Sequence, residues 1–289
     1  MNRKKGKYGY IVMVKKGDED RMKRLCFSMC ICMFMAIFTG CTTTSDANRE
    51  KVDQKEFVAE EVKEMVIQTK TTQIQIRKAQ GNKVQAELLD DQEKSLQLRT
   101  HLQQGKLQLQ IDGESNRILG AVKENGGPIL RVYIPDETLE HVRADTDAGL
   151  IQIEKVQVNQ MELESKTGAI EVEHWKGNKI QCRTETGKVE LEQIDGTFDV
   201  KARTGMVDVD VLDGLKQENR IQVETGKVEV GLPANTEARV ELSTDLGKID
   251  TDFDIHANAG AKGWIGKNPN ASASLSVQTS TGMISLVKK

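Results

Sequence analysis

The residues of this chain that could act together chemically are acidic, and they recur at a fixed place in a repeated phrase. The segments KTGAIEVE, ETGKVELE, RTGMVDVD and ETGKVEVG each carry an acidic residue three positions after a glycine. A fifth copy, at Gly247, extends the set, which is Glu171, Glu190, Asp208, Glu229 and Asp250. Carboxylate oxygens are ligands that Ca²⁺ and Mg²⁺ accept. If the copies stack, they predict a ladder of carboxylates that binds one of these cations weakly.

Ion pairing and screening by solvent and salt are the alternatives to a bound cation. Stacked strands lie about 4.8 Å apart, and at that spacing like charges repel by on the order of 1 kcal/mol per neighbouring pair. Lys188, Lys227 and Lys248 stand one residue after the glycine, where they would neutralise part of this charge. Other basic residues stand on the preceding strand: Lys166, Arg183, Lys201 and Arg203. A second acidic column lies two residues beyond the first: Glu154, Glu173, Glu192, Asp210 and Asp252.

The sequence contains no residue spacing that is typical of a catalytic site. The four histidines are scattered, without the spacing of metalloproteases or hydrolases, and we expect them on the surface: His101, His141, His174 and His256. Cys182 stands where other copies carry Leu or Val, which favours a small core residue. Two Trp and three Tyr form no aromatic row of the kind that binds sugars. We expect no catalytic residue and no cofactor; a polysaccharide-active β-helix enzyme is the alternative.

The strands that must position these residues form a repeat. It can be aligned on Gly149, Gly168, Gly187, Gly205, Gly226, Gly247 and Gly282, of which the first six are spaced by 19, 19, 18, 21 and 21 residues. Ile or Val stands two positions after every glycine, and apolar residues alternate with polar ones on both sides. Each copy is therefore predicted to be a strand, a Thr-Gly corner and a second strand. Glycine can adopt the backbone angles that such a corner requires.

Stacking is the way in which such short units can bury an apolar face. We predict an all-β fold, a parallel β-solenoid (β-helix) with about 20 residues per rung, right-handed by the general preference of parallel crossovers. A β-sandwich is the alternative. The repeat solenoid is expected over 136–289, and apolar alternation predicts an N-terminal strand part over 61–135. The segment FVAEEVKEM (57–65) is compatible with a short helix or with the first strand.

The N-terminus has the features of a lipoprotein signal peptide. From Met22, the better candidate for the true start, the sequence MKRLCFSMCICMFMAIFTGC has a basic beginning, an apolar run and a small residue before a cysteine. FTGC resembles the bacterial lipobox, with Phe38 where Leu is usual, and implies lipid (palmitate) attachment at Cys41. Two or more acyl chains anchor a protein firmly to a membrane. We therefore expect an extracytoplasmic, lipid-anchored protein with a flexible polar tether over 42–60; an uncleaved helix or a cut elsewhere are the alternatives.

The charge and the cysteine content of the mature chain limit the partners and the cross-links that it can have. Removal of 1–41 leaves 32 basic and 41 acidic residues, a net charge of −9, which makes nucleic acid a poor partner. Of the five cysteines, Cys182 alone remains unmodified in the mature chain, so no disulfide can form within it. Too few cysteine and histidine ligands remain for a typical structural zinc site.

The rungs of the form [Thr/Ser]-Gly-x-apolar-x-apolar, behind a VYIP strand and a lipoprotein signal, resemble the bacterial putative-adhesin family. This is a domain of unknown function that includes LiaG-type envelope proteins. The resemblance covers Val66 to Val287; SLSVQTSTGMISLV resembles the family's closing rung, and DIHANAGAKGWIGKNPNAS its Gly-rich excursion. It implies a β-solenoid on the cell envelope, linked to adhesion or stress signalling, and supplies no catalytic residues. We expect a non-enzymatic surface protein with unidentified envelope partners; a passive spacer is the alternative.

Overall fold

The computed structural model describes residues 49–90, 96–113, 127–136, 139–259 and 262–289. The chain divides into Met1–Ala47 and a compact unit, Asn48–Lys289, and the description below concerns the second unit. The predicted signal peptide, the lipid-attachment residue Cys41 and the first part of the predicted tether lie outside the described residues.

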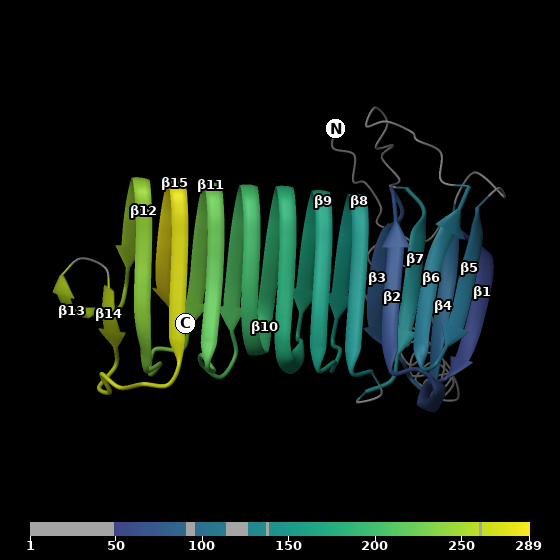
Figure 1. Cartoon of the computed structure of the whole chain (residues 1–289), viewed down its shortest axis with the longest axis horizontal. Helices are drawn as coiled ribbons and strands as arrows, with labels where there is room; N and C mark the ends of the chain where they lie inside the picture. The colour runs from purple at the N-terminus through teal and green to yellow at the C-terminus, as the bar shows by residue number, and fades with distance from the viewer. Residues whose placement is uncertain (1–48, 91–95, 114–126, 137–138, 260–261) are drawn as a thin grey trace, which may run out of the picture. The chain divides into compact units, whose positions relative to one another are not determined.

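The unit is built of β-strands with a single short 3-10 turn, η1 (Ala59–Glu61), among the described residues. The strands of the N-terminal part are β1 (Glu50–Val58), β2 (Glu64–Thr69), β3 (Gln73–Lys78), β4 (Lys83–Asp90), β5 (Gln97–Gln103), β6 (Lys106–Asp112) and β7 (Ile129–Ile134). Those of the repeat are β8 (His141–Glu154), β9 (Gln160–Glu173), β10 (Lys176–Val211), β11 (Glu218–Leu232), β12 (Ala238–Thr251), β13 (His256–Ala259), β14 (Lys262–Ile265) and β15 (Ser274–Lys288) (Figure 1).

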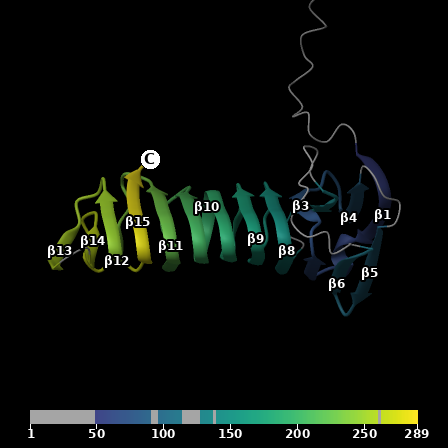
Figure 2. The ribbon, with the colours of Figure 1, turned by 90° about the horizontal axis from the view of Figure 1, so that it is seen from above.

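The Thr-Gly copies stack in parallel and in register. Gly168 of β9 pairs with Gly149 of β8 and with Gly187 of β10. β10 contains two copies, and its second glycine, Gly205, pairs with Gly226 of β11. Figure 2 shows these strands side by side from a second direction. The all-β, solenoid-like arrangement is thus confirmed, and the antiparallel pairing that a sandwich of these copies would need is not seen between them; handedness stays a prediction.

The C-terminal strand is out of chain order in this stack. β15 lies between β11 and β12: Gly282 pairs with Gly226 on one side and with Gly247 on the other. SLSVQTSTGMISLV, the last copy in the sequence, is therefore not the last rung in space, because β12 is the last parallel rung. Beyond β12 the antiparallel pair β14 and β13 ends the sheet (Figure 1).

The N-terminal part continues the stack. β2 pairs in parallel with the part of β8 before Gly149, and β3 pairs in parallel with the part after it, so β2 and β3 together form one further rung. We call the strand parts before the glycine, with β2, β6 and β5, wall A. We call the parts after the glycine, with β3, β7, β4 and β1, wall B. The outermost strands of both walls pair antiparallel, β5 with β6 and β1 with β4.

Strand β1 corrects the predicted tether. Glu50–Val58 pair antiparallel with β4, so the polar segment 42–60 is not a flexible linker beyond Glu50. Most β1 side chains are exposed or half-buried, as expected for a strand at a sheet edge, and its sequence therefore lacks the strong alternation of the inner strands. The segment 57–65, which was compatible with a short helix or with the first strand, contains the end of β1, then η1, and then the beginning of β2.

The two walls enclose one continuous hydrophobic core, which extends from Val62 to Leu286. The positions predicted to face inward two residues after each glycine are fully buried in six rungs: Ile151, Ile170, Val189, Val207, Val228 and Ile284. Ile249, in the last rung, is only partly buried. Burial of each such side chain contributes roughly 1.5–3 kcal/mol, so this column of apolar residues stabilises the stack.

The repeat glycines are needed for two reasons. Gly205 has φ 149°, a backbone conformation that residues with a Cβ rarely adopt. A Cβ atom at this position would also lie 1.7 Å from the carbonyl oxygen of Gly187 in the neighbouring rung. The predicted Thr-Gly corner is confirmed, and the close approach of successive rungs adds a constraint that the sequence alone did not reveal.

Candidate functional site

The acidic ladder lies on the outer face of wall B, and four of its five members are neighbours. Glu171 pairs with Glu190, and Asp208 pairs with Glu229. Asp250 is not next to Glu229, because Ser285 of β15 pairs with both of them. The expected column of five is therefore a row of four carboxylates, a serine and a fifth carboxylate.

Lysines neutralise alternate members of this row. Lys188 donates to Glu190 at 2.6 Å (Nζ to Oε2), Lys227 to Glu229 at 2.7 Å, and Lys248 to Asp250 at 2.5 Å. The expected ion pairing with these three lysines is thus confirmed. Glu171 and Asp208 have no lysine of their own, because Ala169 and Met206 stand one residue after their glycines.

The alternation is complete only in the spatial order of the strands. One residue after the glycine, successive rungs carry Leu150, Ala169, Lys188, Met206, Lys227, Met283 and Lys248. In chain order Lys227 and Lys248 would be neighbours, as would Glu229 and Asp250. The inserted strand places Met283 and Ser285 between these like charges, so β15 acts as an uncharged spacer at this point.

The ionised forms of the two carboxylates without a lysine are disfavoured by their surroundings. Burial raises the pKa of Glu171, and the neighbouring Glu190 raises it further. Burial likewise raises the pKa of Asp208, with added repulsion from Glu229 and Glu190. Hydrogen bonding to Glu190 raises the pKa of Lys188, which also feels the charges of Glu171 and Asp208. Each paired lysine therefore also attracts the unpaired carboxylates beside it.

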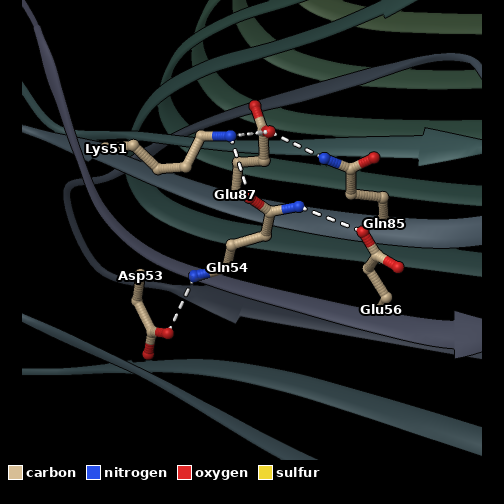
Figure 3. A network of polar contacts seen from close by, with 6 residues as sticks. All are labelled: Lys51, Asp53, Gln54, Glu56, Gln85 and Glu87. Carbon is tan, nitrogen blue, oxygen red and sulfur yellow. Dashed lines mark hydrogen bonds and ion pairs between the residues drawn. The ribbon is translucent and has the colours of Figure 1, made fainter.

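The same row continues into the N-terminal part of the protein. Cross-strand pairing extends it from Glu171 through Gln152, Gln75, Arg131 and Glu87 to Gln54. Figure 3 shows its far end, where Lys51 contacts Glu87 at 2.5 Å and Gln85 donates to the same oxygen at 2.7 Å. Glu87 is only 7% exposed, so these partners stabilise a nearly buried charge. A row of polar side chains thus crosses all of wall B.

The second acidic column is also present on wall B. Glu154, Glu173 and Glu192 pair in succession across neighbouring strands. Three side chains approach it: Arg77 lies 3.4 Å from Glu154, the ring of His174 lies 3.0 Å from Glu173, and Lys289 lies 3.8 Å from Asp210. Asp210 is followed across the strands by Gly231, so this column stops before β15. Asp252, its predicted fifth member, follows β12 and accepts a hydrogen bond from the backbone of Lys288 at 3.2 Å.

Wall A carries alternating charge near the corner and an open hollow. Two residues before the glycines stand Asp147, Lys166, Glu185, Arg203 and Glu224; Lys166 pairs with Asp147 at 2.5 Å and Arg203 with Glu185 at 3.6 Å. The hollow, of about 540 Å³, extends over the next rungs, and its polar lining includes Lys201, Gln222, Gln278, Glu224, Ser280 and Asp245. Neither Arg183 nor Lys201 reaches the acidic row of wall B as a salt-bridge partner in the described part of the chain.

Cys182 lies in the core as predicted, and two of the four histidines are exposed as predicted. Cys182 is fully buried, and burial raises the pKa of its thiol far above its ordinary range, which keeps it protonated and unreactive. His101 and His256 are exposed, and His141 and His174 are half-buried beside carboxylates of the walls. The four histidines lie on different strands or turns and form no joint site.

Metal ligation of the ladder stays a prediction. Among the described residues, no group of three or more His, Cys, Asp or Glu side chains is arranged to hold a metal ion. The described part of the chain also contains no helix that is long and apolar enough to span a membrane.

The parallel rungs, bent at a column of glycines around one core, define a solenoid-like all-β protein. Residues 62–210, just over half of the chain, match the family model described as Toastrack DUF4097. The chain therefore belongs to this family, a domain of unknown function. No curated protein matches it significantly.

Solved structures similar to this chain come from several bacteria. One, a putative cell adhesion protein from Clostridium sporogenes, is 11% identical with a TM-score of 0.38, and the match covers 82% of this chain and 99% of that one. A second, a putative adhesin from Bacteroides fragilis, is 10% identical with a TM-score of 0.44, covering 82% of this chain and 96% of that one. A third, from Parabacteroides distasonis, is 10% identical with a TM-score of 0.31 and the same coverages.

Sequence reasoning missed three features of these surfaces. It did not place Ser285 and Met283 between β11 and β12, although their lack of charge at positions that are charged in neighbouring copies was a usable signal. It did not connect Gln75, Arg131 and Glu87 to the acidic row, because these residues lie outside the repeat. The hollow of wall A depends on side-chain sizes across four rungs, and no motif marks it.

Proposed function

We propose that this protein is a non-enzymatic surface protein of the bacterial cell envelope, anchored by lipid on Cys41. Its two walls serve adhesion, contacts with other envelope proteins, or envelope-stress signalling. The domain carries no chemistry of its own in this proposal, and its function is to present long polar surfaces outside the membrane.

The observation that supports this proposal best is the continuity of the polar rows. Wall B presents one outward row from Gln54 to Asp250, and wall A presents alternating charges along its corner. Periodic, flat and hydrophilic surfaces of this kind suit contacts with an extended partner. The hollow of wall A adds an open, largely polar surface on the other side of the stack.

Lipid anchoring is tested by changing the cysteine itself. In cells fed a clickable palmitate analogue, we expect the wild-type protein to be labelled and to sediment with membranes. Cys41→Ser should abolish both the label and the membrane association. Cys32→Ser is the matched control, since it alters a cysteine within the same apolar segment and should leave labelling unchanged. Equal labelling of Cys41→Ser and the wild type would contradict the anchor.

The surface role is tested with the unit Asn48–Lys289, which has its own continuous core. Incubated with isolated cell envelopes, it should bind reversibly and release no soluble sugar. A variant with Glu171→Gln and Asp208→Asn removes the two carboxylates of the wall B row that have no lysine, whereas Glu185→Gln with Arg203→Gln alters wall A without changing the net charge. Loss of binding in one variant would identify the wall that makes the contact. Release of oligosaccharides from envelope polysaccharide would overturn the non-enzymatic proposal.

A further inference from the structure

The last parallel rung of the stack has an unpaired edge. β15 pairs with β12 along one side from Arg239 to Thr251, whereas β14 covers the other side only from Ala238 to Glu241. Among the described residues, no strand pairs with the remainder of that side, Leu242–Thr251. Figure 1 shows β13 and β14 beside only one end of β12. A free strand edge presents backbone donors and acceptors that readily pair with another chain.

Apolar side chains are more exposed here than in any equivalent rung. Leu246 is 69% exposed, more than any other large apolar residue that the structure describes, and it stands where most other rungs carry threonine. Ile249 is partly exposed, whereas the same position is fully buried in the six other rungs. The core is therefore incomplete at this end of wall B, and a further strand beside β12 would complete it.

The direction of the backbone groups limits how a strand can be added. The N–H of Asp252 donates to the carbonyl oxygen of Leu286 at 2.9 Å, so the backbone of Asp252 faces β15. Backbone groups alternate sides along a strand. Asp250 and Lys248 therefore also face β15, whereas Thr251, Ile249 and Gly247 direct their N–H and C=O groups to the free edge.

The free edge of β12 is complementary to the same edge of a second copy in one antiparallel register. With a two-fold axis through Ile249, Ile249 lies opposite Ile249 of the other copy, and Lys248 lies opposite Asp250 twice. Axes through Lys248 or Asp250 would instead place two lysines or two aspartates opposite each other, which is unfavourable. An axis through Gly247 would place Lys248 opposite Leu246.

We propose that two copies of this protein associate through the free edge of β12, antiparallel about Ile249, to form a symmetric dimer with a continuous wall B. Such an interface is isologous and closed, so it ends at two copies and does not continue into a fibre. It is a case of strand addition to a sheet edge, in which backbone hydrogen bonds supply the affinity and the flanking charges fix the register. The proposal is independent of the surface role and of the lipid anchor.

Charge reversal tests the register. By sedimentation velocity over a range of concentrations, the unit Asn48–Lys289 should show a reversible monomer–dimer equilibrium. Lys248→Asp replaces two opposite-charge contacts with two repulsive ones, and we expect it to weaken dimerisation by about tenfold or more. Lys248→Asp with Asp250→Lys should restore it. Lys227→Asp, the same change in an inner rung, should leave dimerisation unchanged.

Cysteine crosslinking tests the symmetry axis. Opposite residues in a hydrogen-bonded antiparallel pair have Cα atoms about 5.5 Å apart, within the reach of a disulfide. Ile249→Cys should therefore give a covalent dimer on mild oxidation, because the other cysteine of the unit, Cys182, is buried. Leu246→Cys is more exposed but lies far from its own copy in this register, and it should not crosslink. A purely monomeric wild type, a growing series of oligomers, or crosslinking of Leu246→Cys but not of Ile249→Cys would overturn the proposal.

Discussion

At the scale of single residues, the carboxylates of wall B occupy two different settings. Glu190 and Glu229 each have a lysine within hydrogen-bond distance, whereas Asp208 lies between these two acids without a lysine of its own. Partial burial and two like charges make the ionised form of Asp208 unfavourable in the folded protein. The row therefore contains paired carboxylates, which stabilise the fold, and unpaired ones, which oppose it.

Asp208→Asn should stabilise the protein at neutral pH, and the gain should depend on pH. The pKa of Asp208 is raised on folding, so its ionisation destabilises the folded state above that pKa. The gain, on the order of 1 kcal/mol, should be full at pH 7. It should shrink as the pH falls through the raised pKa and vanish below the ordinary value of 3.8. Urea unfolding at several pH values measures it.

Glu190→Gln is the matched control for this prediction. It removes a similar carboxylate from the adjacent rung, but it also leaves Lys188 without its partner. We expect little or no stabilisation from this change. A gain equal to that of Asp208→Asn, or one that is independent of pH, would show that lysine pairing does not distinguish the two sites.

Calcium binding to the acidic row has a clear thermal signature. A ligand that binds only the folded state raises the melting temperature, so millimolar Ca²⁺ should raise that of the wild type if the row holds the cation. Asp208→Asn should then respond less, whereas Glu192→Gln, in the other column, should respond like the wild type. An unchanged melting temperature at millimolar Ca²⁺ would leave lysine pairing and solvent as the only neutralising groups.

At the scale of the element, each rung requires a glycine at its corner. Gly205→Ala would place a methyl group 1.7 Å from the carbonyl oxygen of Gly187 and would require an unfavourable φ. We expect a loss of about 3 kcal/mol or more in the free energy of unfolding. Gly81→Ala is the control, because its Cβ would meet no atom within 4 Å. Similar effects of the two changes in denaturant titration would contradict the close approach of the rungs.

The uncharged character of β15 can be tested at one position. Ser285→Glu would join Glu229 and Asp250 into one uninterrupted acidic stretch, and we expect it to destabilise the protein by about 1 kcal/mol. Ser285→Gln has the same size without the charge and should be nearly neutral. The difference between the two variants should decrease in high salt, because salt screens exposed charges. A difference that is independent of salt would point to packing and not to charge.

The order of the strands shows where the sequence stops being informative. Alternation of apolar residues and the glycine spacing are local features, and they predicted the strands, the corner and parallel stacking. The copies, however, share one register, so any of them can in principle pair with any other. The position of β15 brings its uncharged Met283 and Ser285 between charged residues of the neighbouring rungs, and this arrangement becomes visible only when the strands are placed side by side.

At the scale of the whole compact unit, the N-terminal strands extend the same two walls and do not form a separate layer. β2 and β3 form one further rung on β8, and both ends of the sheet finish in antiparallel pairs. The sequence could not show that Glu50–Val58 form a strand, because a sheet-edge strand with exposed faces has no apolar alternation. The acidic row was predicted. Its continuation into the N-terminal strands and its interruption at Ser285 were not, because both depend on pairings between segments that are distant in the sequence.

Disulfide trapping tests the stacking order most directly, in a chain in which Cys26, Cys30, Cys32 and Cys41 are replaced by serine. Thr225 pairs with Thr281, and Thr281 with Leu246. Thr225→Cys with Thr281→Cys should therefore form an intramolecular disulfide under mild oxidation. Thr225→Cys with Leu246→Cys should not, because β15 lies between these residues and two strand spacings place them roughly 9.6 Å apart. The reverse pattern, a bond between positions 225 and 246 but none between 225 and 281, would contradict the insertion of β15 and the stack built on it.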